Sequence, residues 1–259
     1  MRMRAWDLIE QVFPLIAIVI FFLLWEVLCR IFDVPVFILP KPSEFLGELI
    51  RRFPAILPNA VQTLYTTVLG FALGVAVGAV IGAGIGISRF VYRVTYPLLI
   101  GFYSVPKIAV VPILVIWFGI GTVPAVLTAA IMCLFPVVVN VATGLATTEP
   151  ELEDVLRALG ASKFDILWRV GLPRSMPYFF ASLKIAISLA FVGTVVAETV
   201  AANIGIGSMM ILASSTFDVP LVFAGVFLLA VLGVAMYAVF AFIEGRVTFW
   251  ARRNADIPT

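Results

Sequence analysis

Histidine is absent from this chain of 259 residues, and cysteine occurs only twice, at Cys29 and Cys133. Histidine is the side chain whose unperturbed pKa lies nearest neutrality, so its absence excludes histidine-based acid–base catalysis and histidine metal sites. Two cysteines, each within an apolar run, build no disulfide framework. The composition therefore excludes a disulfide-stabilised scaffold and a histidine-centred active site.

Charged residues are also scarce. They make up 12% of the chain and hydrophobic residues 63%, whereas an ordinary globular domain has roughly 25% charged and roughly 45–50% apolar residues. The composition therefore predicts an integral membrane protein. The formal net charge is only +2, and the 17 basic residues are dispersed along the chain, which argues against nucleic acid as a partner.

A nucleotide-binding P-loop is missing as well. That motif needs glycine immediately before its lysine, because its backbone amides cradle the phosphates that the lysine reaches. The lysines of this chain follow Pro40, Pro106, Ser162 and Leu183 instead. We also find no set of nucleophile, base and oxyanion donors. The sequence thus predicts a protein that is not an enzyme and that binds no cofactor itself.

The chain contains many long apolar runs. A membrane-spanning helix needs about 20 mostly apolar residues. Six runs qualify, at residues 13–32, 60–87, 94–118, 122–147, 176–200 and 219–245. All are too long for strands, so we predict an all-α membrane protein with six transmembrane helices. No small-residue cleavage site follows the first run, so we expect that helix to be retained.

The distribution of basic residues predicts the orientation. Six crossings place both termini on one side of the membrane, and loops rich in Lys and Arg stay in the cytoplasm. Most of the 17 basic residues lie on the side of the termini, and the opposite side holds only Arg30, Lys41, Arg51 and Arg52. Both termini, and the segment between the fourth and fifth runs, are therefore expected in the cytoplasm.

Glycine and proline predict the shape of two spans. Glycine recurs every four residues in the second run, at Gly70, Gly74, Gly78, Gly82 and Gly86. This spacing leaves one helix face without side chains, and we favour tight packing of that face within one subunit over a contact between subunits. The third run contains Pro97, Pro106 and Pro112, so it should be kinked or broken.

The stretch FILPKPSEFLGELIRRFPAI between the first two runs predicts a turn followed by a short amphipathic helix. One face of that helix is apolar (Phe45, Leu46, Leu49, Ile50 and Phe53), which is typical of a helix that lies in the membrane interface. We therefore expect a transmembrane helix and an external interfacial helix at 1–57. A transmembrane core at 58–250 and a cytoplasmic tail at 251–259 would follow.

One long segment looks water-soluble: EDVLRALGASKFDILWRVGLP, residues 153–173. Gly160 is placed to end a first helix, and Ser162 with Asp165 is placed to cap a second, which should close at Leu172 and Pro173. Each helix carries an apolar face (Leu152, Val155, Leu156 and Leu159 in the first; Phe164, Leu167 and Trp168 in the second). The segment predicts two helices around a glycine turn that present apolar side chains to water.

Three interpretations of this segment compete. A DNA-binding helix-turn-helix has this outline, but phosphate binding needs surplus positive charge, and acids outnumber bases in residues 149–174. The other two interpretations stay open. The segment is either a helix pair packed on the protein's own cytoplasmic face, or a docking surface whose apolar side chains fill a groove on another protein.

The segment also resembles a known motif. Asp154-Val155-Leu156, three residues, Gly160, nine residues and Val170-Gly171-Leu172-Pro173 are similar to the EAA motif of binding-protein-dependent ABC importer permeases. The glycine, its spacing and Leu-Pro match, whereas the first three residues stand where the motif has Glu-Ala-Ala. The stretches ILPKPSEFLGEL, PKIAVVPILVIWFGIG and VAETVAANIGIGSMM resemble the nitrate/sulfonate/taurine permeases of that family.

This resemblance implies an architecture and partners. It implies the five-helix core of a type I ABC importer permease in the bacterial inner membrane. The chain would act as a homodimer with two cytoplasmic ATPase subunits, which would bind ATP and Mg²⁺, and an external solute-binding protein. The ATPase would contact the coupling loop 149–174 at Asp154, Val155, Leu156, Leu159, Gly160, Ala161, Phe164, Leu167, Leu172 and Pro173.

Ionisable residues at membrane depth mark candidate sites because burying them is costly. Glu26 lies one turn from Arg30 and is expected to pair with it. Lys184 either reaches back to the cytoplasmic surface or lines the path. Lys107 lies where the third helix should break, and it either offsets an anionic solute or pairs with Glu198.

Small residues after Glu198 predict a re-entrant gate near the external face. The resemblance assigns this region to the closure of the translocation path. The candidate path and gate residues are Lys107, Glu198, Asn203, Gly205, Gly207 and Ser208.

The predicted function is therefore the membrane-spanning permease subunit of an ATP-driven ABC importer. Its solute would be a small organic or inorganic anion or a vitamin precursor. The alternative is a self-contained secondary transporter or channel, which would need no ATPase and would use ion sites inside the membrane.

Overall fold

A computed structural model describes residues 5–147 and 150–248, and all regular structure in these ranges is helical. The elements are α1 (Ala5–Ile31), α2 (Pro42–Arg51), α3 (Phe53–Gly86), α4 (Arg89–Tyr103), η1 (Lys107–Val110), α5 (Val111–Phe118), α6 (Thr122–Ala146), α7 (Pro150–Ala158), α8 (Lys163–Ile166), η2 (Leu167–Gly171), α9 (Leu172–Ala201), α10 (Ile206–Ser215) and α11 (Val219–Val247). The all-α prediction is confirmed. The expected tail at 251–259 lies outside the described residues.

Five stretches of the described chain are long and apolar enough to cross a membrane: Phe13–Ile31, Phe53–Gly86, Thr122–Ala146, Phe164–Ala201 and Val219–Val247. A sixth candidate span is a bent pair of helices, Arg89–Tyr103 and Lys107–Phe118, which meet at an angle of 74°. The break falls at Pro106, whereas Pro97 lies inside α4 and Pro112 in the first turn of α5. Pro106 lacks the amide hydrogen that would continue α4.

The second span starts earlier than predicted. α3 begins at Phe53 rather than at 60, so it also runs through the boundary expected at 57/58. Pro54 occupies the first turn of the helix, where a missing amide hydrogen costs nothing, and Pro58 is accommodated inside it. Both prolines therefore lie within the helix itself.

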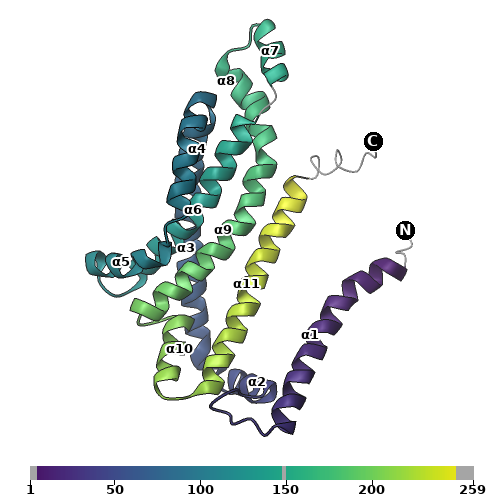
Figure 1. Cartoon of the computed structure of the whole chain (residues 1–259), viewed down its shortest axis with the longest axis vertical. Helices are drawn as coiled ribbons and strands as arrows, with labels where there is room; N and C mark the ends of the chain where they lie inside the picture. Colours follow the sequence, from purple (N-terminus) through teal and green to yellow (C-terminus); the bar gives the residue numbers. More distant parts are fainter. Residues whose placement is uncertain (1–4, 148–149, 249–259) are drawn as a thin grey trace.

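The core is built from α3, α6 and α9 (Figure 1). The glycine face of α3 lies directly on α6: a Cβ added at Gly82 would come within 2.7 Å of the Val138 carbonyl oxygen, and one at Gly86 within 2.8 Å of that of Ala142. On its other side α6 packs against α9 through small buried residues such as Ala186. The predicted tight packing within one subunit is confirmed.

α1 stays apart from this core and joins it at one end only (Figure 1). Glu26 Oε1 accepts hydrogen bonds from Arg30 Nη2 (2.6 Å) and Ser43 Oγ (2.8 Å), which ties α1 to the start of α2. The Glu26–Arg30 pair is thus confirmed. An aromatic cluster joins α1 and α2 to α11 (Phe22, Trp25, Phe45, Phe223 and Phe227). From Phe13 to Ile31, most other side chains of α1 are exposed apolar groups, as expected of a helix surrounded by lipid.

The two ends of the molecule differ in character. α7 and α8 form a hairpin at one end, and α2 and α10 lie at the other (Figure 1). In Figure 1 α1 runs toward the end that holds α2 and α10, and α11 runs away from it. The buried core between the two ends consists of the long helices α3, α6 and α9.

Candidate functional site

The first candidate site is the hairpin of α7 and α8. Gly160 ends α7 with φ +83°, a left-handed conformation that favours glycine. Ser162 and Asp165 form the predicted cap: Asp165 N donates to Ser162 Oγ (3.2 Å) and Ser162 N donates to Asp165 Oδ2 (3.1 Å). The predicted helix, glycine turn and helix are present.

The second helix of the hairpin does not close at Leu172 and Pro173, which corrects the prediction. It passes through η2, a turn of π-helix, directly into α9. Pro173 lies in the first turn of α9, and the wider π turn before it accommodates the missing amide hydrogen. One continuous helical path therefore leads from Phe164 to Ala201.

The predicted docking residues divide into two groups. Leu159 and Phe164 are 78% and 66% exposed, and Val155 is exposed as well. Asp154 and Pro173 are also exposed, whereas Leu156 and Ala161 are half-buried. Leu167 and Leu172 instead pack against the chain's own core. The outward apolar surface of the hairpin thus consists of Val155, Leu159 and Phe164, joined by Trp168.

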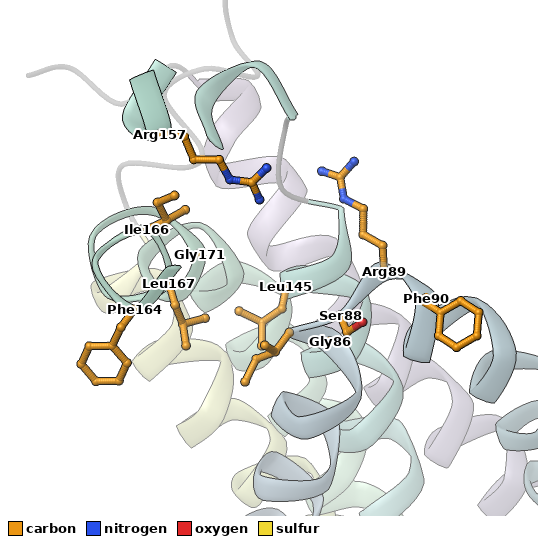
Figure 2. Close-up of a pocket in the computed structure, with 11 residues that line it drawn as sticks. Gly86, Ser88, Arg89, Phe90, Leu145, Arg157, Phe164, Ile166, Leu167 and Gly171 are labelled. Atoms are coloured by element: carbon orange, nitrogen blue, oxygen red, sulfur yellow. The ribbon is translucent and has the colours of Figure 1, made fainter. Parts of the chain in front are cut away.

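A cavity of about 770 Å³ separates the hairpin from the ends of the long helices. Figure 2 shows Phe164, Ile166 and Leu167 on the hairpin side of this cavity and Gly86, Ser88, Arg89 and Phe90 on the side of α3 and α4. A hairpin packed flat on its own protein would leave no such space. The hairpin is therefore not packed flat against α3 and α4, and docking on another protein stays a prediction.

The second candidate site is a polar cluster where α9 ends and α10 begins. Glu198 is only 2% exposed, and its Oε2 accepts hydrogen bonds from Thr63 Oγ1 (2.9 Å) and Gly207 N (3.1 Å). Thr63 Oγ1 also accepts from Ile206 N (2.9 Å), and Asn59 Oδ1 accepts from Gly205 N (3.0 Å). Side chains of α3 and α9 thus hold the first amide groups of α10.

The glycines of this turn are needed for close approach. Gly205 has φ +138°, and a Cβ on it would overlap the Glu198 carboxylate. A Cβ on Gly207 would come within 2.8 Å of Glu198 Cβ. Asn203 lies exposed at the turn and Ser208 is half-buried in the first turn of α10. Of the predicted gate residues, the structure thus brings Glu198, Gly205 and Gly207 into contact.

Lys107 lies apart from this cluster. Its Nζ donates to the Tyr103 carbonyl oxygen (2.9 Å) and lies 4.1 Å from the centre of the Tyr103 ring and 5.0 Å from that of Phe135. Among the described residues it forms no ion pair with Glu198, so the pairing that the sequence left open is not observed. A cation here stabilises the carboxyl end of α4 at the bend.

Lys184 has a partner that the sequence analysis missed. Its Nζ lies 2.5 Å from Glu244 Oε2, so α9 and α11 are joined by an ion pair of largely buried side chains. Glu244 stands at the end of the sixth run, where it resembled a flanking surface charge. The polar residues of α3 were missed too, although Asn59, Gln62 and Thr63 recur one turn apart in an otherwise apolar span.

Thr63→Val tests the polar cluster at nearly constant volume. The substitution removes the hydroxyl that joins Glu198 to Ile206 N, so two buried groups each lose a partner. We expect a loss of about 1–3 kcal/mol in unfolding free energy, seen as a lower thermal midpoint of the purified chain. Thr147→Val is the control because the Thr147 hydroxyl bonds only within its own helix. Equal midpoints for both variants would contradict the linking role of Thr63.

Comparison with known proteins identifies the family. A family model described as "Binding-protein-dependent transport system inner membrane component" matches residues 70–249. The chain is 30% identical over 252 residues to the formylaminopyrimidine transport permease protein ThiX of Halalkalibacterium halodurans, covering 97% of this chain and 99% of that one. It is 31% identical to the riboflavin transport system permease protein RibX of Chloroflexus aurantiacus, covering 91% of this chain and 88% of that one.

The fold also has a solved counterpart. An inward-facing structure of the MetNI methionine ABC transporter matches 76% of this chain and 98% of the solved chain, with a TM-score of 0.66 at 18% identity. The fold is therefore that of a type I ABC importer permease. Since the family model covers well over half of the sequence, this chain belongs to the inner membrane components of binding-protein-dependent transport systems, the multi-pass permease subunits of bacterial ABC importers.

Proposed function

We propose that two copies of this chain form the translocation path of an ATP-driven importer and that each copy binds a separate ATPase subunit through the α7–α8 hairpin. The observation that carries the proposal is the outward apolar surface of Val155, Leu159, Phe164 and Trp168 on a segment expected in water. Exposed apolar groups of this kind mark protein contacts. ATP and Mg²⁺ would be held by the ATPase subunits.

The contact would involve the exposed part of the hairpin. We assign to it Asp154, Val155, Leu156, Leu159, Gly160, Ala161 and Phe164. Leu167, Leu172 and Pro173 belong instead to the connection between the hairpin and α9, because the two leucines pack on the core. The first group would bind the ATPase and the second would transmit its movement.

The continuous helix supplies a route for coupling. When the ATPase pair closes on nucleotide, the two hairpins would move together, and the path from Phe164 to Ala201 would carry this displacement along α9. At the far end of α9, Glu198 is bonded to α3 and to the start of α10. A shift of α9 would therefore act on the predicted gate of Asn203, Gly205, Gly207 and Ser208, as rigid elements do in domain movements.

The expected solute is a vitamin or vitamin precursor, or a small anion. Support for the first class comes from the relatives named for formylaminopyrimidine and riboflavin, both of which match most of the chain. Support for an anion comes from Lys107, whose half-buried ammonium group lies beside a cavity of about 160 Å³ at the bend of the third span. The external binding protein would deliver the solute.

Reconstitution tests the proposal. The chain is purified together with an ATPase subunit and a solute-binding protein of the same organism and placed in proteoliposomes. Formylaminopyrimidine and riboflavin serve as probes. Hydrolysis of ATP and uptake are both expected to depend on the loaded binding protein. Uptake by this chain alone, driven by an ion gradient, would instead favour a secondary transporter.

Lys107→Ala tests the translocation path. The change removes the cation that contacts the Tyr103 carbonyl and two aromatic rings, and we expect uptake to fall about 3- to 10-fold. Lys107→Met retains the aliphatic chain and should lose activity to a similar extent if charge matters. Membrane insertion, measured by the amount of extracted protein, should not change. Wild-type uptake by both variants would remove Lys107 from the mechanism.

A further inference from the structure

Glu198 is bonded through one carboxylate oxygen only. Oε2 accepts from Thr63 Oγ1 and Gly207 N, whereas no donor among the described residues reaches Oε1, which is also buried. A buried charged oxygen without a partner is strongly destabilising. The turn around Gly205 and Gly207 nevertheless keeps the carboxylate in place. Within the described residues, Glu198 Oε1 therefore has no hydrogen-bond partner.

A polar cavity of about 180 Å³ lies against this carboxylate. Besides Glu198, polar side chains from α3 and α6 line it: Gln62, Thr66 and Thr122. Gln62 Nε2 donates to Thr66 Oγ1 (3.2 Å) and to Thr122 Oγ1 (3.1 Å), so one amide group draws both hydroxyls together. Oxygen atoms from three helices thus line the cavity, beside the apolar side chains of Ala125, Ala202 and Ile204.

The described lining of the cavity has a single acidic group. Glu198 is the only ionisable side chain among the described residues that line it. α9 ends beside it at Ala201, where the carbonyl groups of the last turn carry partial negative charge. Ala202 and Asn203 follow in the lining. No basic side chain of the described residues lines the cavity.

We propose that this cavity binds a small monovalent cation such as Na⁺, held by Glu198 Oε1 and by the neutral oxygens of Gln62, Thr66 and Thr122. Oxygen donors are the ligands of hard cations, and unwound helix ends with carbonyl groups hold Na⁺ in other membrane proteins. A single carboxylate matches a single positive charge, whereas Ca²⁺ sites use several carboxylates. The volume leaves room for the ion and several waters, at about 30 Å³ each.

The ion would join three helices at the end opposite the hairpin. Gln62 and Thr66 belong to α3, Thr122 begins α6, and Glu198 lies near the end of α9. Because Glu198 also holds Gly207 N, the ion would stabilise the start of α10. The cavity shares Glu198 and Asn203 with the predicted gate.

Sodium titration of the full chain in lipid nanodiscs tests the site. The thermal midpoint is followed by fluorescence of the 5 tryptophans, with NaCl replacing choline chloride at constant ionic strength. We expect a saturable rise of about 2–4 °C, abolished by Glu198→Gln. Thr122→Val, which changes an exposed side chain, should raise the half-saturating Na⁺ concentration several-fold. If E198Q does not fold, equilibrium binding of radioactive sodium is measured on the wild type and on T122V instead. Weaker binding by T122V than by the wild type is the expected result, and equal binding would contradict the site.

Glu26→Gln is the matched control, because Glu26 lies outside the cavity and has its own partners, Arg30 and Ser43. This variant should keep the full response to Na⁺. A response to K⁺ as large as that to Na⁺ would support a monovalent site without size selection. Identical midpoints in choline and Na⁺, or a Na⁺ response that persists in E198Q, would overturn the proposal.

Discussion

Replacing Gly74 with leucine is expected to prevent stable packing of α3 on α6. A Cβ at this position would overlap Cys133 Sγ and lie 2.6 Å from the Ala130 carbonyl oxygen and 3.1 Å from Ala130 Cα. Two of these three atoms are backbone, so the helices must separate to admit the side chain. We expect a cost of about 3 kcal/mol or more and a large loss of monodisperse protein after detergent extraction.

Gly84→Leu is the matched control for this prediction. Gly84 lies on the same helix, but a Cβ there would meet nothing within 4 Å. Leucine should also favour a helix over glycine. The yield and thermal midpoint of this variant should therefore equal or exceed those of the wild type. If both variants had the same yield and thermal midpoint, the glycine face would not be needed for the close approach of α3 and α6.

Leu159→Asp is expected to release the ATPase without harming the fold. Leu159 is 78% exposed at the tip of the hairpin, so a charge there costs nothing in the free chain but would be buried in the proposed contact. Central apolar contact residues are worth about 2 kcal/mol or more, which corresponds to roughly 30-fold weaker binding. Co-purification of the ATPase and coupled uptake should both fall.

Two further variants give this experiment its controls. Ile50→Asp changes an equally exposed residue, 77% accessible on α2 at the opposite end, and should leave the ATPase bound. Gly160→Pro should weaken the ATPase contact as Leu159→Asp does, because proline does not adopt the φ of +83° found there. Wild-type co-purification by L159D, with hydrolysis still dependent on solute, would show that the hairpin does not dock the ATPase.

Leu167→Asp distinguishes docking from folding within the same segment. The predicted docking surface included both Leu159 and Leu167, but Leu167 packs against the core formed by α6 and α9. A charge there should lower the stability of the chain itself. Each leucine lies on the apolar face of a predicted helix in the sequence. Only their neighbours in the folded chain show that one is exposed and the other packed.

Features that depend on local chemistry could be predicted from the sequence. The apolar runs predicted the spans because lipid satisfies no backbone hydrogen bond. Pro106 broke the third span, the glycine face packed within the subunit, and Ser162 with Asp165 capped the second hairpin helix. Each of these outcomes follows from the covalent geometry or hydrogen bonding of residues that are close together in the chain.

The partners of the polar residues inside the membrane depend on the tertiary fold. Thr63 bonds Glu198 across 135 positions of the chain, and Lys184 pairs with Glu244 rather than reaching the surface. The continuation of the hairpin into α9 through η2 also depends on packing, since Pro173 alone indicated an end. Such outcomes depend on which helices lie side by side, because a buried polar group takes whatever partner the neighbouring helix offers.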